Sequence, residues 1–264
     1  MNSSKKPEAA FSRLTSIVDT LMSEGGCPWD LVQTRESLKP YLVEETYETL
    51  EALDGNQPEK IVDEMGDLLY QILFHSKISE NRGEFNITDV IENLSEKMIR
   101  RHPHVFSKKS ETDTPEKVLH QWDEIKKQEK GNQNQKSVLD NVPKALPGLA
   151  RAQKLQKKAA KQGFDWDQVE DVIAKLDEEV EEFKEAFRDD DTPHMTEEMG
   201  DLLFVIVNLA RYKKIDAEEA LRGTSNKFIK RFQHIEQEVA KRGKTLKETS
   251  LEEMERYWQE AKKL

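Results

Sequence analysis

The chain has 264 residues, enough for one large domain or two ordinary ones, and its 41 Lys and Arg against 52 Asp and Glu leave a net charge of −11. This charge argues against a general nucleic-acid binder, because phosphate backbones attract basic surfaces, and the single cysteine, Cys27, excludes an intrachain disulfide and a cysteine-rich zinc site. No apolar run has the length of a signal-peptide core or a membrane span, so we expect a cytoplasmic protein that binds neither nucleic acid nor membranes.

Helices are the predicted elements of the first half. Apolar residues recur at helical intervals over 11–22, 34–53, 59–79 and 88–101. Gly25-Gly26-Cys27-Pro28 ends the first of these helices, and the turn over 54–58 separates the second from the third. Thr88 or Asp89 is the expected N-cap of the fourth.

The second half shows the same order of elements after a stretch, 126–148, that we interpret as a linker. Helices are predicted over 169–187, 196–212 and 216–237, and no run alternates apolar and polar residues as a strand does. The sequence therefore predicts an all-α fold with one domain over 1–125 and another over 149–264.

An acidic pattern occurs once in each half. Subtracting positions gives the same offset for all four acids, since 179−45, 182−48, 198−64 and 201−67 are all 134; the acids are Glu45, Glu48, Glu64 and Asp67 in the first copy and Glu179, Glu182, Glu198 and Asp201 in the second. Further along, Lys97 and Arg101 match Lys227 and Arg231 at an offset of 130. A site was evidently duplicated.

The spacing of these acids favours a metal site. Carboxylates three residues apart share a helix face, and two antiparallel helices would bring both pairs together. Converging carboxylates need a cation, and oxygen ligands without His or Cys suit Mg²⁺ or Mn²⁺. Glu198 and Asp201 stand in a helix that is apolar on almost every side, which predicts burial, and Gly200 predicts a close approach of a helix or ligand.

Basic and aromatic residues downstream suit a phosphate-bearing ligand. Lys227 and Arg231, four residues apart, share a helix face that can contact phosphate oxygens. Trp258 can stack on a base, although packing in a core is the commoner role of a tryptophan.

At this point the sequence resembles a known family. E-E-x-x-E followed by E-x-x-D, with G-D-L-L and a downstream N-K-F-x-x-R-F, is similar to the MazG nucleoside triphosphate pyrophosphohydrolases. G-C-P-W-D in the first copy, R-R-H-P-H-V-F after it and G-F-D-W-D in the second resemble the tandem-domain form found in bacteria. The resemblance extends over nearly the whole chain.

This resemblance implies a fold, a reaction and a set of site residues. It implies MazG-like helical domains whose bundles are completed by homodimerisation, and Mg²⁺-dependent hydrolysis of (d)NTPs to (d)NMP and pyrophosphate, with broad base specificity, for nucleotide-pool control or house-cleaning. By matching position, the metal ligands would be Glu179, Glu182, Glu198 and Asp201, with Glu45, Glu48, Glu64 and Asp67 in the first copy. The nucleotide would contact Lys175, Asn226, Lys227, Arg231 and Trp258, and Glu178 or Glu182 would activate water.

The first copy departs from this substrate shell. Lys175 corresponds to Tyr41, and Asn226 corresponds to Glu96, which would put a negative charge beside Lys97. An added anion weakens triphosphate binding, so we expect the second copy to carry most of the activity.

Two other interpretations compete. A di-iron carboxylate bundle requires E-x-x-H motifs, and none of the six histidines is expected at a site position. A non-catalytic helical nucleotide sensor or scaffold predicts no Mg²⁺-dependent turnover.

Overall fold

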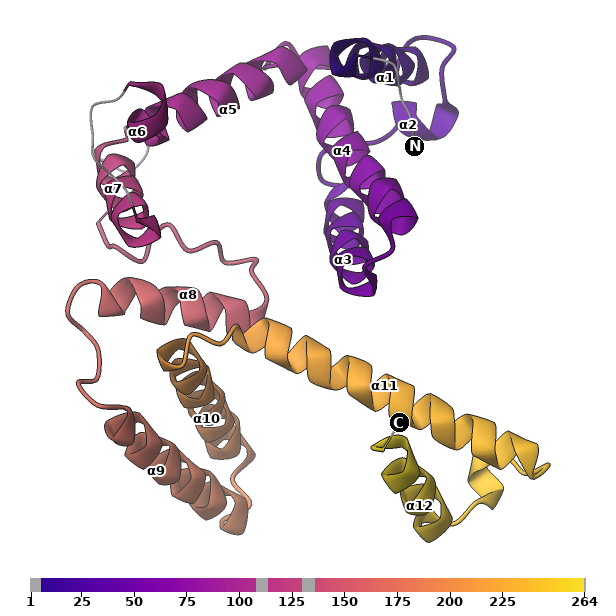
Figure 1. Cartoon of the computed structure of the whole chain (residues 1–264), viewed down its shortest axis with the longest axis vertical. Helices are drawn as coiled ribbons and strands as arrows, with labels where there is room; N and C mark the ends of the chain where they lie inside the picture. Colours follow the sequence, from indigo (N-terminus) through magenta and orange to yellow (C-terminus); the bar gives the residue numbers. More distant parts are fainter. Residues whose placement is uncertain (1–5, 108–113, 130–135, 264) are drawn as a thin grey trace. The chain divides into compact units, whose positions relative to one another are not determined.

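The computed structural model describes residues 6–107, 114–129 and 136–263 (Figure 1). Contacts divide the chain into two compact units, Met1–Glu129 and Lys130–Leu264. The division falls inside the stretch 126–148 that we interpreted as a linker. Residues 130–135 of that stretch lie outside the described residues, and 126–128 belong to a helix.

The described residues of the first unit fold into helices. They are α1 (Pro7–Leu21), α2 (Pro28–Leu31), α3 (Lys39–Gly55), α4 (Pro58–Asn81), α5 (Ile87–Arg101), α6 (Pro103–Phe106) and α7 (Pro115–Gln128). Proline occupies the first turn of α1, α2, α3, α4, α6 and α7, where its missing N–H costs no helical hydrogen bond.

The second unit has the same character. Its elements are α8 (Gly148–Ala160), α9 (Val169–Arg188), α10 (Thr192–Tyr212), α11 (Ala217–Lys241), the 3₁₀ turn η2 (Leu246–Glu248) and α12 (Leu251–Ala261). The described residues of both units contain no strand, so the prediction of an all-α fold is confirmed. Five helices, α2, α6, α7, α8 and α12, were not predicted from the sequence.

The start of α5 corrects one predicted cap. Asn86, not Thr88 or Asp89, is the N-cap: its side-chain oxygen accepts hydrogen bonds from the backbone N–H groups of Thr88 and Asp89. Asp89 in turn accepts from the backbone N–H of Asn86 at 2.8 Å, which completes a capping box. Asp89 is thus the reciprocal partner of the cap.

A helical hairpin of α3 and α4 forms the centre of the first unit. The Thr49 hydroxyl donates to the backbone oxygen of Glu64 at 3.2 Å and joins the two helices where their acids lie. Helix α1 packs on α4 over a small core. This core consists of Val18, Met22, Leu38, Leu73, Phe74 and Ile78.

The second unit contains the equivalent hairpin of α9 and α10, covered on one side by α8 (Figure 1). Gln156 of α8 donates to the backbone oxygen of Phe204 at 2.7 Å, and Gln153 donates to that of Ile215 at 2.6 Å. The long helix α11 leads away from this group, and α12 packs against its C-terminal part over Ile235, Val239 and Tyr257.

The described helices are all too short or too polar to cross a membrane.

Candidate functional site

Three carboxylates of the second unit converge between α9 and α10. Glu179 and Glu182 lie three residues apart on α9, Glu198 lies on α10, and one oxygen of each is within 4.8 Å of the others. Glu179 is only 5 % exposed, and Glu182 and Glu198 are partly buried. Asp201, expected to be the fourth ligand, is exposed and lies outside this group.

The first unit repeats the arrangement between α3 and α4. Oxygens of Glu45, Glu48 and Glu64 lie within 4.8 Å of one another, and Asp67 is outside the group. Burial raises the pKa of Glu45, and the charges of Asp67, Glu48 and Glu64 raise it further. The duplicated pattern therefore produces two carboxylate clusters of the same design.

The two clusters differ in the cation beside them. Lys175 lies next to the second cluster and forms ion pairs with Glu178 at 2.6 Å and Glu179 at 2.8 Å. Hydrogen bonds to these two carboxylates raise the pKa of Lys175, so its ammonium group stays charged. The matching Tyr41 instead contacts Trp29 edge to face, with ring centroids 5.7 Å apart.

The pKa of Glu182 also depends on the charges of its neighbours. Burial raises its pKa, and the charges of Glu179 and Glu198 add to this effect, whereas Lys175 opposes it. The cluster therefore holds negative charges that a cation would stabilise.

A histidine that the sequence analysis missed contacts the second cluster. The Nε2 of His194 lies 3.1 Å from an oxygen of Glu198, one turn later on α10. His194 is therefore a neighbour of the cluster that was not predicted, and its spacing of four residues from Glu198 was the available signal. His194 does not belong to the group of converging ligand atoms, so the structure does not form the E-x-x-H site of a di-iron bundle there.

Helix α10 is more open than predicted. Met199, Leu203, Phe204 and Ile206 are 41–45 % exposed, and only Val205 and Val207 are buried. A Cβ at Gly200 would meet no described atom within 4 Å. The predicted burial of α10 and the predicted close approach of another helix at Gly200 are therefore wrong for the single chain, because α8 and α9 cover only part of α10. The alternative of a ligand at Gly200 stays a prediction.

The predicted nucleotide residues lie mostly on α11 and α12. The guanidinium of Arg231 lies 5.4 Å from the ring centroid of Trp258, and the ring of Phe228 lies 5.3 Å from it. Asn226 and Lys227 are exposed on α11. Among the described residues, no hydrogen bond or ion pair joins these side chains to the carboxylate cluster, whereas Lys175 is already in contact with it.

The duplication continues into the last helix of each unit, which the sequence analysis also missed. Thr114 and Ser250 cap α7 and α12, and Trp122 and Trp258 follow eight residues later, so both pairs have an offset of 136 (250−114 and 258−122). The matched cap and tryptophan were the available signal.

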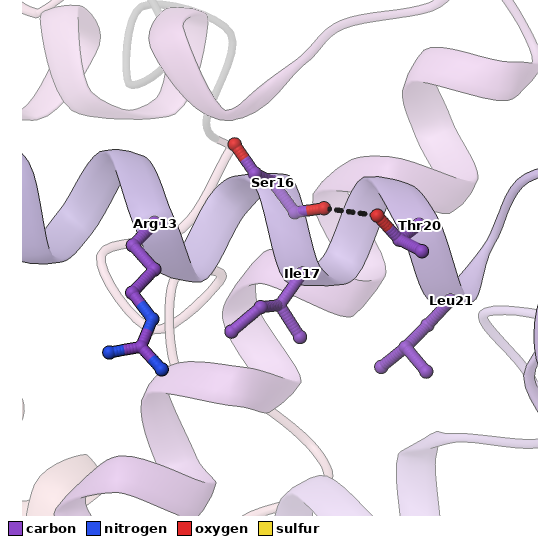
Figure 2. Close-up of a pocket in the computed structure, with 5 residues that line it drawn as sticks. All are labelled: Arg13, Ser16, Ile17, Thr20 and Leu21. Atoms are coloured by element: carbon purple, nitrogen blue, oxygen red, sulfur yellow. Dashed lines mark hydrogen bonds between the residues drawn. The ribbon is translucent and has the colours of Figure 1, made fainter.

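The one hollow that Figure 2 shows lies elsewhere, along α1. It has a volume of about 290 Å³ and is lined by Arg13, Ser16, Ile17, Thr20 and Leu21. The Thr20 hydroxyl donates to the backbone oxygen of Ser16. No carboxylate is among its lining residues, so it lacks the anionic oxygen ligands of the two clusters.

The donor set of each cluster fits a hard divalent cation. All its ligand atoms are carboxylate oxygens, held by neighbouring helices that the hairpin fixes. Mg²⁺ and Mn²⁺ prefer such oxygen ligands, whereas zinc prefers sites with His and Cys.

Comparison with known proteins agrees with this arrangement. The family model described as "MazG nucleotide pyrophosphohydrolase domain" matches residues 33–106 and 167–236, and each match contains one cluster. The chain is 44 % identical over 258 residues to the Thermotoga maritima protein named nucleoside triphosphate pyrophosphohydrolase/pyrophosphatase MazG, covering 98 % of both chains.

Two further relatives extend the comparison. The nucleoside triphosphate pyrophosphohydrolase of Escherichia coli (strain K12) is 42 % identical over 96 % of this chain and 97 % of its own length. YabN of Bacillus subtilis is 48 % identical over 96 % of this chain and 51 % of its own length. From two family matches and two full-length relatives, we conclude that this chain belongs to the MazG nucleotide pyrophosphohydrolase family.

Proposed function

We propose that this chain hydrolyses nucleoside triphosphates, with ribose or deoxyribose, to the monophosphate and pyrophosphate in a Mg²⁺-dependent reaction. The observation that carries this proposal is the convergence of Glu179, Glu182 and Glu198 within 4.8 Å, with Lys175 beside them. The names of the Thermotoga maritima and Escherichia coli relatives support the same activity. Control of the nucleotide pool, in the cytoplasm, is the proposed role.

The cluster suits this reaction because a triphosphate brings several negative charges. Mg²⁺, or Mn²⁺ in its place, would be held by Glu179, Glu182 and Glu198 and would offset charge on phosphate oxygens. Asp201 is one turn after Glu198 on α10 and remains a proposed further ligand. Lys175 is held at the edge of the cluster, where its ammonium group can donate to a phosphate oxygen.

Two carboxylates are candidates for orienting or deprotonating the attacking water. Glu182 is one of the three clustered ligands, whereas Glu178 lies outside the cluster, paired with Lys175 at 2.6 Å. Because Glu178 is not needed as a ligand, the geometry favours it for this role.

The nucleoside would lie against α11 and α12. Trp258 would stack on the base, and Lys227 and Arg231, whose guanidinium lies over the Trp258 ring, would contact phosphate oxygens. Stacking tolerates every base, so we propose a broad base specificity, with Asn226 as an additional polar contact.

A homodimer is part of the proposal. The exposed apolar side chains of α10 lie beside the metal ligand Glu198, and no described hydrogen bond or ion pair links the α11 residues to the cluster. A second copy packed on α9 and α10 would cover this face and complete a helical bundle.

The second unit is the proposed site of most of the turnover. It has Lys175, ion-paired with Glu179, where the first unit has Tyr41, which contacts Trp29 instead. Burial raises the pKa of Glu64 in the first unit, and the charge of Lys60 partly opposes this shift, but among the described residues no ion pair joins Lys60 to that cluster. The first unit fits the alternative of a non-catalytic helical nucleotide sensor or scaffold better, because among its described residues no lysine is ion-paired with the cluster as Lys175 is in the second unit.

Product identification tests the reaction. Purified protein is incubated with each (d)NTP and Mg²⁺, and the products are separated; we expect the monophosphate and pyrophosphate. The variant Glu198→Gln should lose turnover, and the matched variant Glu64→Gln, at the same position of the first unit, should keep most of it.

Three outcomes would contradict the proposal. Release of the diphosphate and inorganic phosphate would exclude the proposed bond cleavage. Loss of activity only in Glu64→Gln would reverse the assignment of the units. Absence of turnover with either metal would leave a nucleotide sensor or scaffold.

A further inference from the structure

The arginine at the end of α5 is held by a carboxylate. The Nε and one terminal nitrogen of Arg101 donate to the two oxygens of Glu129 at 3.1 and 2.7 Å. Arg100 donates to the same carboxylate at 2.9 Å. The side chains of Arg101 and Glu129 are only 22 % and 18 % exposed. Two arginines therefore bind one anionic group, and Arg101 and Glu129 are partly buried while Arg100 is half exposed.

The equivalent arginine of the second unit is paired differently. Arg231 matches Arg101 at an offset of 130, and its guanidinium lies over Trp258. Among the described residues, no carboxylate lies within ion-pair distance of Arg231. Arg231, which we propose for phosphate contact, therefore has no carboxylate partner among the described residues. Its counterpart Arg101 is ion-paired with Glu129.

The aromatic part of the site is present in the first unit as well. Trp122 matches Trp258 at an offset of 136, and its ring forms a T-shaped pair with that of His102, the residue after Arg101, with ring centroids 4.9 Å apart. The Nε1–H of Trp122 is buried and has no hydrogen-bond partner among the described residues. An unpaired buried donor of this kind favours binding of a group that brings an acceptor.

Glu129 has the charge and the acceptors of a phosphate oxygen pair. The hydrogen bonds from Arg101 and then Arg100 hold the pKa of Glu129 at about 2, so it is ionised at neutral pH. Forked, charge-assisted hydrogen bonds to arginine are the contacts by which proteins bind both carboxylates and phosphates.

We propose that Arg100, Arg101 and Trp122 form a second nucleotide site, in the first unit, whose phosphate position Glu129 occupies as an internal competitor. The class of ligand rests on the proposed role of Arg231 and Trp258; the competition rests on the contacts of Glu129. A nucleotide with a phosphate chain displaces the Glu129 carboxylate, and its base stacks on Trp122. Because the competitor is tethered, the site binds weakly in the unmodified chain.

Binding stoichiometry tests the proposal in the full chain. The ligand is the α,β-methylene analogue of ATP, which resists cleavage at the proposed bond, titrated with Mg²⁺ by calorimetry. We expect one tight site per chain and a second site roughly tenfold or more weaker. In Glu129→Gln the second site tightens by about that factor, and adding Arg101→Ala removes it.

A matched variant controls for the loss of an ion pair. Glu84 forms a forked pair with Arg35 in the same unit, at 2.6 and 3.2 Å, remote in sequence from Trp122. Glu84→Gln should leave the binding of the analogue unchanged. Circular dichroism of each variant shows whether the helices remain, and if Glu129→Gln fails to fold, loss of the weak site in Arg101→Ala alone decides the matter.

The outcomes separate this proposal from the proposed function. Equal binding by the unmodified chain and Glu129→Gln, or a second site that survives Arg101→Ala, would show that Glu129 and Arg101 form only a structural ion pair. No tight site in the unmodified chain but one new site in Glu129→Gln would support this inference and contradict the nucleotide site of the second unit. Equal binding of inorganic tripolyphosphate would exclude the role of Trp122.

Discussion

Replacing Glu45 by glutamine should stabilise the metal-free protein. Its carboxylate lies within 4.8 Å of those of Glu48 and Glu64, and the position that holds Lys175 in the second unit is Tyr41 here. Two like charges at this distance repel by about 3.5 kcal/mol at an effective dielectric constant of 20 and by about 0.9 kcal/mol in bulk water. Because these side chains are partly exposed, solvent screening favours the lower figure, and we expect a gain of about 1 kcal/mol.

The effect should depend on pH with a definite sign. Burial and then the charge of Asp67 raise the pKa of Glu45 above its ordinary value of 4.5, so the folded chain binds this proton more tightly than the unfolded chain does. The contribution of Glu45 to the free energy of unfolding is therefore most favourable below pH 4.5 and is lost as the pH rises through the folded-state pKa. Glu45→Gln has no such loss.

Urea unfolding measures this prediction. The unfolding midpoint is followed in a chelator, at neutral pH and near pH 4.5, and again with Mg²⁺. The variant should be more stable than the unmodified chain in chelator at neutral pH, and Mg²⁺ should stabilise the unmodified chain more. Glu51→Gln, on the same helix but outside the cluster, is the control. An equal or lower midpoint for Glu45→Gln in chelator, or an equal gain from Mg²⁺, would refute the reasoning.

Three further predictions concern single contacts. His194→Ala removes a neighbour of Glu198, the proposed metal ligand, so the Mg²⁺ concentration for half-maximal turnover should rise about tenfold; an unchanged metal titration would contradict this. Phe74 is 1 % exposed in the core of the first unit, so Phe74→Ala should lower the free energy of unfolding by about 3–5 kcal/mol. The variant should show a lower urea midpoint and retain turnover. The lowered pKa of Glu129 stabilises the first unit above pH 4.5, and this contribution is lost as the pH falls toward about 2; acid unfolding of Glu129→Gln should lack this component.

The sequence predicts the carboxylate clusters well because two local rules determine them. Glu179 and Glu182 share a face of α9 through the helical period, and a short turn forces α10 back alongside, which brings Glu198 within reach. The same offset predicts the first cluster. Asp201 follows the same local rule, but the structure does not place it within the cluster of the single chain.

Contacts between distant parts of the chain could not be predicted in this way. Glu129 lies 28 residues after Arg101, and nothing in the local pattern of either residue specifies their pairing. The capping box of Asn86 and the contact of His194 with Glu198 are local by contrast, and their spacings of three and four residues were available in the sequence. The helical period determines which residues share one face of a helix, but it does not determine which residues elsewhere in the chain contact that face.

The openness of α10 was not predictable for a related reason. An apolar helix indicates that other helices pack against it, but the sequence pattern does not say whether those helices belong to the same chain. Only the arrangement of α8 and α9 shows that Met199, Leu203 and Phe204 stay about 41–45 % exposed.

The exposed apolar face of α10 has a consequence for the proposed activity, which would depend on the protein concentration. If the cover is another copy, it is acquired by mass action, and the fraction of covered helices falls as the protein is diluted. Specific activity would then decline below a threshold concentration and recover on reconcentration. Assays at nanomolar enzyme would underestimate turnover, and the apolar side chains beside Glu198 would set the concentration at which this happens.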